Sequence, residues 1–283
     1  MKNLIVRGVS GVVMLAVLLG AILTSQWGFT ALMAAIAIGG MWEFYNFAEK
    51  AGYKPMKVLG LFLGAVIFAI GLAASLFFNK GAEGSGAVIL SAAVAVLMLI
   101  VPVMAICELY RRSETPIANI ATSVLGSLYV ALPMALMLII PLLLANGKWN
   151  PWVVLFYIFI IWANDVFAYL FGITLGRHRL FERISPKKSW EGFVGGLFGA
   201  VAMGYVASVV LDANPAMWMG LAMVAAISGV FGDLVESLFK RSIDIKDSGN
   251  FIPGHGGWLD RFDALIMSAP FVFVYAVIYS IIL

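Results

Sequence analysis

Cysteine and charge are both scarce in this sequence. A single cysteine, Cys107, stands among 283 residues, so the chain has no internal disulfide and no metal site built from several cysteines. Only 12% of the residues are charged, against about 25% in a typical soluble domain. The formal net charge of +3 is too small to indicate a nucleic-acid-binding protein. By contrast, 63% of the residues are hydrophobic, which predicts a polytopic membrane protein.

The N-terminal segment has some features of a secretory signal. Lys2 and Arg7 precede an apolar run that ends near Thr24. No small-x-small cleavage site comes before Gln26, and further apolar runs follow. We therefore expect an uncleaved first helix.

Long apolar runs fill most of the chain. A helix needs about 20 apolar residues to cross a hydrocarbon core about 30 Å thick, and an open strand cannot satisfy its backbone there. Segments of this kind fall near 8–25, 27–45, 57–78, 86–107, 118–146, 152–174, 190–211, 216–236 and 262–283. We predict an all-α polytopic membrane protein with about nine transmembrane helices. The 118–146 run contains Pro133 and Pro141, so we expect it to be kinked.

The basic residues predict the orientation of these helices. With a cytoplasmic N-terminus, every Lys and Arg except Lys80 and Lys148 falls on the cytoplasmic side, as the positive-inside rule requires. The C-terminus then lies on the opposite side, and the polar loops 175–189 and 237–261 share the cytoplasmic face. A compact chain without a soluble extension is typical of a bacterial inner membrane, where we expect this protein.

No soluble domain, low-complexity linker or clear internal repeat interrupts the chain, so we expect one integral-membrane domain over residues 1–283. The first five spans, in residues 1–150, would form a lipid-facing scaffold. The last four, in residues 151–283, would carry the catalytic loops. Glycines four residues apart predict close packing of helices at three pairs: Gly60/Gly64, Gly192/Gly196 and Gly195/Gly199.

Ionisable residues inside the spans are candidate site residues, because a charge in hydrocarbon is costly. Asp233 and Glu236 are three residues apart and so share one face of a helix. Asp260 and Asp263 have the same spacing where the last span begins. The others are Asp165 in the middle of the sixth span, Glu191 at the start of the seventh, and Glu43 near the end of the second, which we interpret as structural.

Three of these carboxylates, Asp233, Asp260 and Asp263, are expected at one membrane depth, where they would repel one another unless cations are present. One interpretation is ion pairing with the nearby bases, which are Lys240, Arg241 and Arg261. The other is Mg²⁺, which prefers oxygen ligands and commonly uses one or two carboxylates plus substrate phosphates. The second interpretation predicts an enzyme that acts on a nucleotide.

The loop 175–189 adds five positive charges. Three of them fit the ordinary positive-inside bias or contact with anionic lipid: Arg177, Arg179 and Arg183. The other two, Lys187 and Lys188, stand just before the start of a helix, where an anion is favoured. We interpret His178, which lies among the arginines, as a bystander.

The loop 237–261 contains a Pro-Gly-His-Gly-Gly turn at residues 253–257, where glycines let backbone N–H groups approach a ligand. His255 either orients a neighbour or contacts the ligand directly, and both roles stay open. Together, the basic loops and the acids predict a cytoplasm-facing pocket that opens toward lipid. Such a pocket suits the joining of a phosphate-bearing soluble substrate to a phosphate-bearing lipid.

The segment from Ser237 to Asp263 resembles the signature of the phosphatidate cytidylyltransferase family, the CDP-diacylglycerol synthases. That signature runs Ser-x-x-Lys-Arg, four residues, Lys-Asp, and after a short step Pro-x-His-Gly-Gly-x-x-Asp-Arg-x-Asp. The matching residues are Ser237, Lys240, Arg241, Lys246, Asp247, Pro253, His255, Gly256, Gly257, Asp260, Arg261 and Asp263. The segments 185–192 and 232–236 also resemble the family, so the specific match covers about the last 120 residues. Relatives often have Ser-Asp-Thr-Gly-Ala-Tyr in the sixth span, and the different residues here, from 163 to 169, leave the role of Asn164 open.

The resemblance implies that the chain is a nucleotidyltransferase that converts CTP and phosphatidate to CDP-diacylglycerol and pyrophosphate in phospholipid biosynthesis. It implies Mg²⁺ as cofactor, with a second cation left open, and the metal ligands would be Asp233, Asp260 and Asp263. The implied catalytic residues are Asp233, Lys240, Asp260 and Asp263. The implied substrate-binding residues are Lys187, Lys188, Arg241, Lys246, Asp247, His255, Gly256, Gly257, Arg261 and Asp165. The expected partners are CTP, phosphatidate and the bilayer; a homodimer is left open, and no nucleic acid is expected.

Other functions fit only part of this pattern. A transporter of a phosphorylated or anionic solute would explain buried acids and glycine-rich helices, but not why the charges cluster at one face beside a long glycine-containing loop. Broken helices matched between two repeated halves would favour a transporter, and the sequence has none. A CDP-alcohol phosphotransferase would carry the motif Asp-Gly-x-x-Ala-Arg, which this sequence lacks. A pure scaffold would not need so many carboxylates at one depth.

Overall fold

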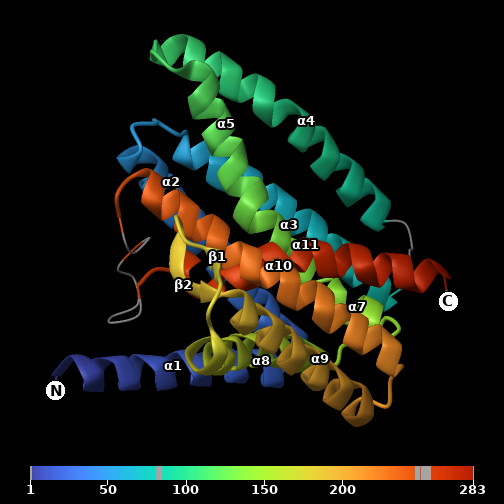
Figure 1. Cartoon of the computed structure of the whole chain (residues 1–283). Coiled ribbons are helices and arrows are strands. Elements are labelled where there is room, and N and C mark those ends of the chain that lie inside the picture. Colours follow the sequence, from blue (N-terminus) through green and yellow to red (C-terminus); the bar gives the residue numbers. More distant parts are fainter. Residues whose placement is uncertain (1, 81–84, 246–248, 250–255, 283) are drawn as a thin grey trace. The chain divides into compact units, whose positions relative to one another are not determined.

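The computed structural model describes residues 2–80, 85–245, 249 and 256–282 (Figure 1). Within these residues, eight helices are long and apolar enough to cross a membrane, and a shorter apolar helical stretch runs from Gly8 to Thr24. The prediction of an all-α polytopic membrane protein is therefore confirmed. The orientation of the helices in the membrane stays a prediction.

The helices follow the predicted apolar segments closely. The first half of the chain contains α1 (Lys2–Thr24), α2 (Gln26–Lys50), α3 (Lys57–Lys80), α4 (Ser85–Arg111), α5 (Pro116–Gly126), η1 (Ser127–Ala131), α6 (Leu132–Met137) and α7 (Ile140–Leu144). The second half contains α8 (Pro151–Leu175), β1 (Arg179–Phe181), β2 (Ser185–Ser189), α9 (Trp190–Val210), α10 (Pro215–Ser242) and α11 (Leu259–Ile282).

The predicted kink in the 118–146 run appears as two interruptions of the helix. One turn of π-helix, η1, lies just before Pro133, and a turn at residues 138–139 separates α6 from α7, which contains Pro141. Proline has no N–H to donate, and its ring clashes with the carbonyl four residues earlier, so a regular α-helix cannot continue through it. A wider π turn is one of the ordinary ways to relieve that conflict.

The chain forms two compact units. Unit 1 consists of Met1–Leu142 and Ile245–Arg261, and unit 2 consists of Leu143–Asp244 and Phe262–Leu283. Helix α11 thus starts in unit 1 and continues in unit 2.

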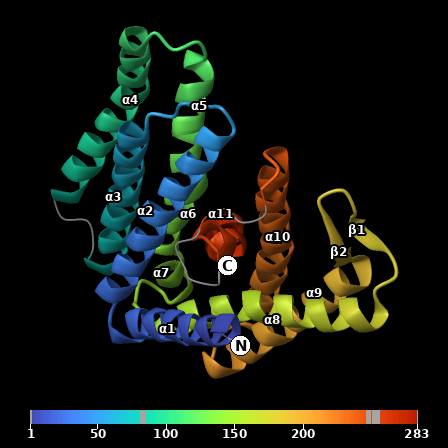
Figure 2. The same ribbon diagram turned by 90° about the vertical axis from the view of Figure 1, so that its left-hand side faces the viewer.

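Unit 1 is built around α2, α3 and α5, which run side by side (Figure 2). The buried Tyr45 on α2 donates a hydrogen bond from its hydroxyl to the carbonyl of Ser123, 2.8 Å away. A Cβ atom at Gly60 or Gly126 would lie within 2.4 Å of the Tyr45 side chain. These two glycines therefore let the large tyrosine fit between α3 and α5.

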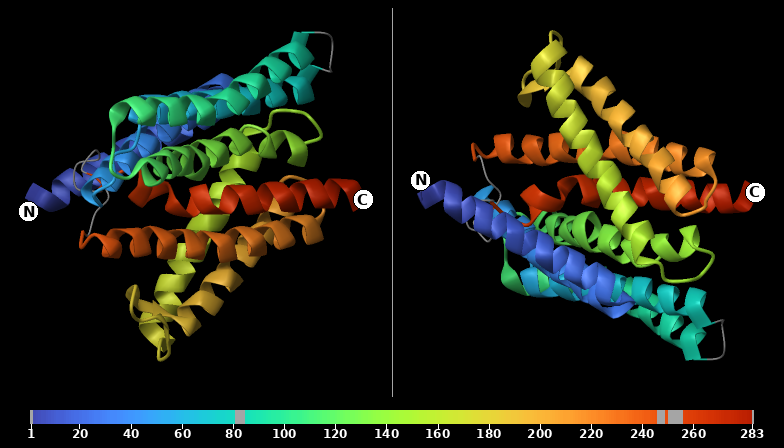
Figure 3. Two further views of the ribbon diagram at one scale, coloured as in Figure 1. Left: turned by 90° about the horizontal axis from the view of Figure 1, so that it is seen from above. Right: turned by 90° about the horizontal axis from the view of Figure 1, so that it is seen from below.

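Unit 2 consists of the α8–α9 pair together with α10 and most of α11, which run alongside each other (Figure 3). Helix α9 presents glycines to α8. A Cβ at Gly196 would lie 2.7 Å from Asn164 Oδ1, and one at Gly199 would lie 2.4 Å from the ring of Phe167. The predicted role of the glycine pairs in helix packing is thus confirmed in unit 2, as it is in unit 1 by Gly60 and Gly64.

The polar loop 175–189 contains the one feature of unit 2 that the apolar pattern does not predict. Two short antiparallel strands, β1 and β2, form a hairpin in which Arg179 lies opposite Ser189 and Phe181 opposite Ser185. The hairpin ends directly at α9, where the Ser189 hydroxyl caps the helix by accepting the N–H of Gly192 at 3.1 Å.

Candidate active site

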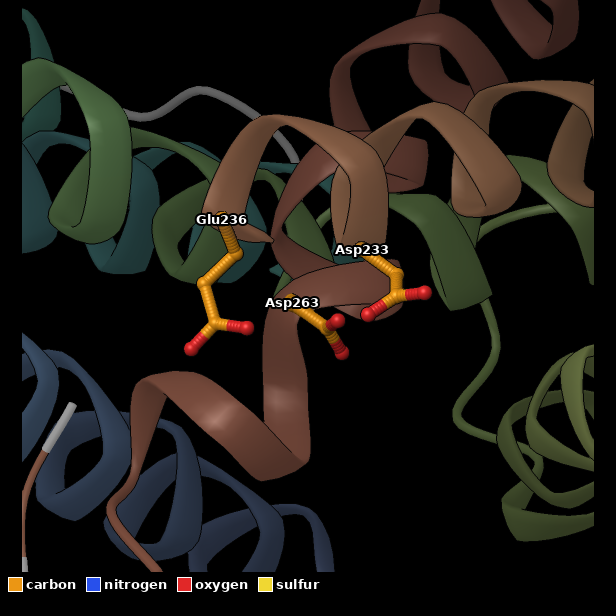
Figure 4. A group of neighbouring side chains, drawn as sticks. All are labelled: Asp233, Glu236 and Asp263. Atoms are coloured by element: carbon orange, nitrogen blue, oxygen red, sulfur yellow. The ribbon is translucent and has the colours of Figure 1, made fainter. Parts of the chain in front are cut away.

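Three carboxylates of unit 2 gather on one side of α10 and α11 (Figure 4). Asp233 and Glu236 come from α10 and Asp263 comes from α11. One oxygen from each lies within 4.8 Å of the other two. Glu236 is buried, whereas Asp233 and Asp263 are half-buried.

A glycine on α10 makes this gathering possible. A Cβ at Gly232 would lie 2.5 Å from the carbonyl oxygen of Asp263 and 2.8 Å from the Cβ of Met267. No larger residue fits there unless the two helices move apart. Gly232 therefore brings the backbones of α10 and α11 together, and this places Asp233, the next residue, beside Asp263.

Two lysines pair with these carboxylates. Lys188, on β2, forms an ion pair with Asp233. Lys240, one turn beyond Glu236 on α10, donates to Glu236 at 2.7 Å, and the side chains of this pair are only 14% and 5% exposed. The site thus contains the two kinds of group that a metal–phosphate complex requires, oxygen ligands and cations.

A fourth acid, Asp165, extends the group from α8. It interacts electrostatically with Lys188 and Asp233, and Asp263 interacts with it in turn. The amide of the buried Asn164 lies 3.4 Å from Asp165 Oδ1. The sequence left the role of Asn164 open. The structure places its side chain beside Asp165 and against Gly196.

The hairpin separates the two lysines that the sequence pairs together. Lys188 turns toward Asp233, whereas Lys187 is exposed. The base of the hairpin is held by Glu191, in the first turn of α9, whose carboxylate accepts the backbone N–H groups of Arg177 at 3.1 Å and His178 at 3.2 Å. His178 Nδ1 lies 2.6 Å from the same carboxylate, so His178 takes part in holding the hairpin, while its predicted absence from the chemistry stays a prediction.

Unit 1 holds the glycine turn that leads into α11. Gly256 has a φ of +84°, a left-handed conformation that favours glycine, and Asp260 Oδ2 accepts the N–H of Gly257 at 3.0 Å. The buried Glu43 on α2 accepts the N–H of Leu259 at 3.1 Å and so holds the first turn of α11. This contact agrees with the structural role that we assigned to Glu43.

The predicted site residues therefore fall into three sets. Those gathered in unit 2 are Asp165, Lys188, Asp233, Lys240 and Asp263, and the exposed Lys187 and Arg241 belong to the same unit. Those in unit 1 are Gly256, Gly257, Asp260 and Arg261. Those outside the described residues are Lys246, Asp247 and His255. Glu236 is the site residue missing from the predicted metal ligands, although its spacing of three from Asp233 already placed both on one face.

The carboxylate group suits a small divalent cation. All its donors are hard oxygens, which Mg²⁺ prefers at about 2.1 Å, so two ligands on opposite sides of the ion lie about 4.2 Å apart. The observed limit of 4.8 Å is within a small side-chain adjustment of that separation. When ionised, the four acids Asp165, Asp233, Glu236 and Asp263 exceed the two lysines by two negative charges, which is the charge one Mg²⁺ would balance.

Comparison with known proteins identifies the family. The model of the cytidylyltransferase family matches residues 5–279, almost the whole chain. The chain belongs to this family. It is therefore a nucleotidyltransferase and an integral membrane protein, as the signature and the apolar helices led us to expect.

Individual relatives agree with this assignment. The chain is 34% identical over 186 residues to the phosphatidate cytidylyltransferase of Rickettsia bellii, an alignment that covers 63% of this chain and 78% of the relative. It is 45% identical over 119 residues to the protein of the same name from Staphylococcus saprophyticus, and 44% identical over 119 residues to that of Staphylococcus aureus (strain COL). Each of these two alignments covers 41% of this chain and 46% of the relative, so the chain matches less than half the length of the staphylococcal proteins.

Proposed function

We propose that this chain is a phosphatidate cytidylyltransferase that makes CDP-diacylglycerol and pyrophosphate from CTP and phosphatidate. The observation that carries the proposal is the cluster of Asp233, Glu236 and Asp263 with Lys188 and Lys240, in a chain of the cytidylyltransferase family. In the reaction, a phosphate oxygen of phosphatidate attacks the α-phosphorus of CTP. The bond from that phosphorus to the bridging oxygen breaks, and pyrophosphate leaves with the electron pair.

The two lysines would reduce the main barrier to this reaction, which is the repulsion between two highly charged anions, CTP and phosphatidate. Phosphoryl-type transfer depends mostly on alignment and on neutralising charge, rather than on covalent chemistry by the protein. Lys188 and Lys240 each hold a carboxylate by an ion pair. A substrate phosphate offers each ammonium group a second anionic partner, so the lysines can hold the phosphates in place while the reacting oxygen and phosphorus approach.

The carboxylates would hold Mg²⁺. Asp233, Glu236 and Asp263 are the ligands that the geometry favours, and Asp260 stays a proposed ligand from the family signature. A bound Mg²⁺ would supply positive charge to the phosphate oxygens of CTP. The carboxylates in turn would fix where that charge lies. A second cation is an extension of this proposal.

We place the reaction on the cytoplasmic side of a bacterial inner membrane, where CTP is available. The strong bias of Lys and Arg toward one side of the predicted topology and the bacterial sources of the relatives support this placement. A homodimer is a further proposal, which light scattering of the detergent-solubilised protein would test.

The test is turnover of purified protein in detergent with labelled CTP, phosphatidate and Mg²⁺, with and without EDTA. We expect label to appear in a lipid-extractable product only when Mg²⁺ and phosphatidate are both present. Omitting phosphatidate is the control for label that reaches the lipid extract without the proposed reaction. Folded protein that transfers no label to lipid would refute the proposal, and uptake of labelled solute into vesicles would then favour the transporter.

A further inference from the structure

We propose that Glu191 is a positioning residue that holds Lys188 at the carboxylate cluster by clamping the base of the β1–β2 hairpin. The part that concerns catalysis rests on the proposed cytidylyl transfer. The part that concerns the hairpin rests on geometry alone. Glu191 lies in unit 2 with everything it is proposed to act on.

The clamp joins the two ends of the hairpin. Glu191 belongs to the first turn of α9, yet its carboxylate accepts the N–H groups of Arg177 and His178, which follow α8 and lie 14 and 13 residues before Glu191. His178 Nδ1 adds a third contact at 2.6 Å. Next to these contacts, the N–H of Trp190 donates to the carbonyl of His178 at 2.9 Å. One side chain therefore fixes the segment that enters the hairpin to the helix that follows it.

Pairing within the hairpin itself is limited. β1 is only three residues long, and the register between β1 and β2 is irregular. Short two-stranded hairpins are marginally stable by themselves. If Glu191 were removed, the N–H groups of Arg177 and His178 would lose their acceptor, and the base of the hairpin would loosen.

Loosening the base of the hairpin would directly change the position of Lys188. Only Ser189 and Trp190 separate it from Glu191, and its ammonium group must reach across to Asp233 on another element. Lys187, its exposed neighbour, shows that the strand also has a side that faces away from the cluster. A twist at the base would therefore change which lysine faces Asp233. Glu191 selects the arrangement with Lys188 inside.

Spin-label distances test the clamp without any use of activity. We would place labels at Arg183, in the exposed turn of the hairpin, and at Ala216, exposed in the first turn of α10, after Cys107→Ala removes the native thiol. We expect Glu191→Ala to broaden the distribution of the distance between the labels at least twofold. Glu191→Gln keeps one amide oxygen as an acceptor and should restore part of the narrow distribution.

Kinetics then test the consequence for the reaction. We expect Glu191→Ala to lower kcat/KM for CTP on the order of 10- to 100-fold, the size typical of residues that orient a ligand group from behind it. The thermal midpoint should fall only slightly, and Glu191→Gln should recover part of the activity. Glu182→Ala is the matched control: this exposed acid of the same hairpin forms no side-chain hydrogen bond or ion pair among the described residues, and its removal should change neither measurement.

Each of the other outcomes would contradict one part of the proposal. An unchanged distance distribution in Glu191→Ala would overturn the clamp, even if activity were lost. A broadened distribution with kcat/KM within twofold of normal would overturn the link to Lys188. If the unsubstituted protein transferred no cytidylyl group, the proposed function would fail, and the spin-label distances alone would still decide whether Glu191 holds the hairpin.

Discussion

Two buried glutamates, one in each unit, look alike in the sequence but differ in their surroundings. Glu108 on α4 and Glu236 on α10 both lie near the end of a long apolar helix, and they are 3% and 4% exposed. Each is paired with a base about one turn later, Arg111 in unit 1 and Lys240 in unit 2. Neither burial nor pairing distinguishes them.

Around Glu108, donors and acceptors match. One carboxylate oxygen pairs with Arg111 and the other accepts from the amide of Asn119 at 3.4 Å. Arg111 also donates to the carbonyl of Lys54 at 3.1 Å, and Asn119 Oδ1 accepts the N–H of Lys54 at 2.8 Å. One acid and one base hold the 51–56 connection against α4 and α5, and no charge is left over within this group.

Around Glu236, the acids outnumber the lysines paired with them in the part of the chain that the structure describes. Asp233 and Asp263 lie within 4.8 Å of it, and two lysines cannot balance these acids together with Asp165. Such an arrangement costs stability unless a cation or a reaction makes use of it. The comparison teaches that excess charge, and not a buried acid as such, distinguishes the group that we propose as the active site.

A large effect should come from removing charge in the cluster. Asp233→Asn should lower turnover on the order of 10²- to 10³-fold, because it removes a proposed metal ligand and the ion-pair partner of Lys188. Turnover in detergent and the thermal midpoint are the measurements. The midpoint should stay or rise, since repulsion among the acids is relieved. If stability fell and the folded fraction turned over normally, Asp233 would be a structural acid like Glu108 and not a residue of the active site.

The next comparison decides whether Glu236 or Asp260 joins Asp233 and Asp263 in the proposed ligand set. Glu236→Gln should reduce Mg²⁺ affinity, seen as a higher Mg²⁺ concentration for half-maximal turnover, if the carboxylate geometry is correct. Asp260→Asn keeps an oxygen that can accept the N–H of Gly257, so the turn before α11 should survive. We expect Asp260→Asn to abolish turnover, as the family signature implies. Near-normal activity of Asp260→Asn at physiological Mg²⁺ would remove it from the metal site.

Spacing between α10 and α11 should have a smaller effect. Gly232→Ala would force a Cβ to within 2.5 Å of the Asp263 carbonyl, so the helices must separate and the carboxylates with them. We expect a 10- to 100-fold loss of kcat/KM, typical of changes behind a ligand. Gly229→Ala, one turn away on α10, is the matched control, because its Cβ would meet Ala264 at an ordinary 3.5 Å. Equal losses of kcat/KM in both variants would show that replacing a glycine in α10, and not the spacing between α10 and α11, lowers the activity.

The smallest effect on chemistry should come from unit 1. Glu108→Ala removes a buried carboxylate from Arg111, whose side chain is 37% exposed, and should cost about 1–3 kcal/mol of stability, the range for leaving a hydrogen-bonding group without its partner. The turnover number of the protein that remains folded should stay within twofold of normal. Thermal unfolding in detergent and turnover per folded molecule are the two measurements. A large loss of turnover at unchanged stability would contradict the contrast between the two glutamates.

Much of the fold could be predicted because hydrocarbon leaves the chain few choices. Apolar length fixes a spanning helix, and the two prolines of the 118–146 run locate its interruptions at η1 and before α7. The packing role of the glycine pairs could be predicted for a similarly local reason, because only small residues allow close contact between helices.

The rest depended on contacts between distant residues. The hairpin escaped prediction because β1 has three residues, and its base is held by Glu191 from beyond the loop. Glu236 was on the predicted face of α10, but only the position of Asp263 on α11 reveals that it completes a cluster. The contact of His178 was not predicted because its partner, Glu191, lies 13 residues away in the sequence.

The π turn η1 has a consequence for how this chain tolerates insertions and deletions. A π turn holds one residue more than the α-helical turn it replaces, and each residue rotates an α-helix by about 100°. Deleting one residue between Ser127 and Ala131 would therefore restore a regular helix and leave the side chains of α6, such as the buried Met134, facing as they do now, whereas forcing an α turn with all five residues would rotate α6 by about that angle relative to Ser123. The wider turn thus absorbs one residue, so that the stretches before and after η1 both keep their buried faces, and a deletion at this point should be better tolerated than one elsewhere in the run.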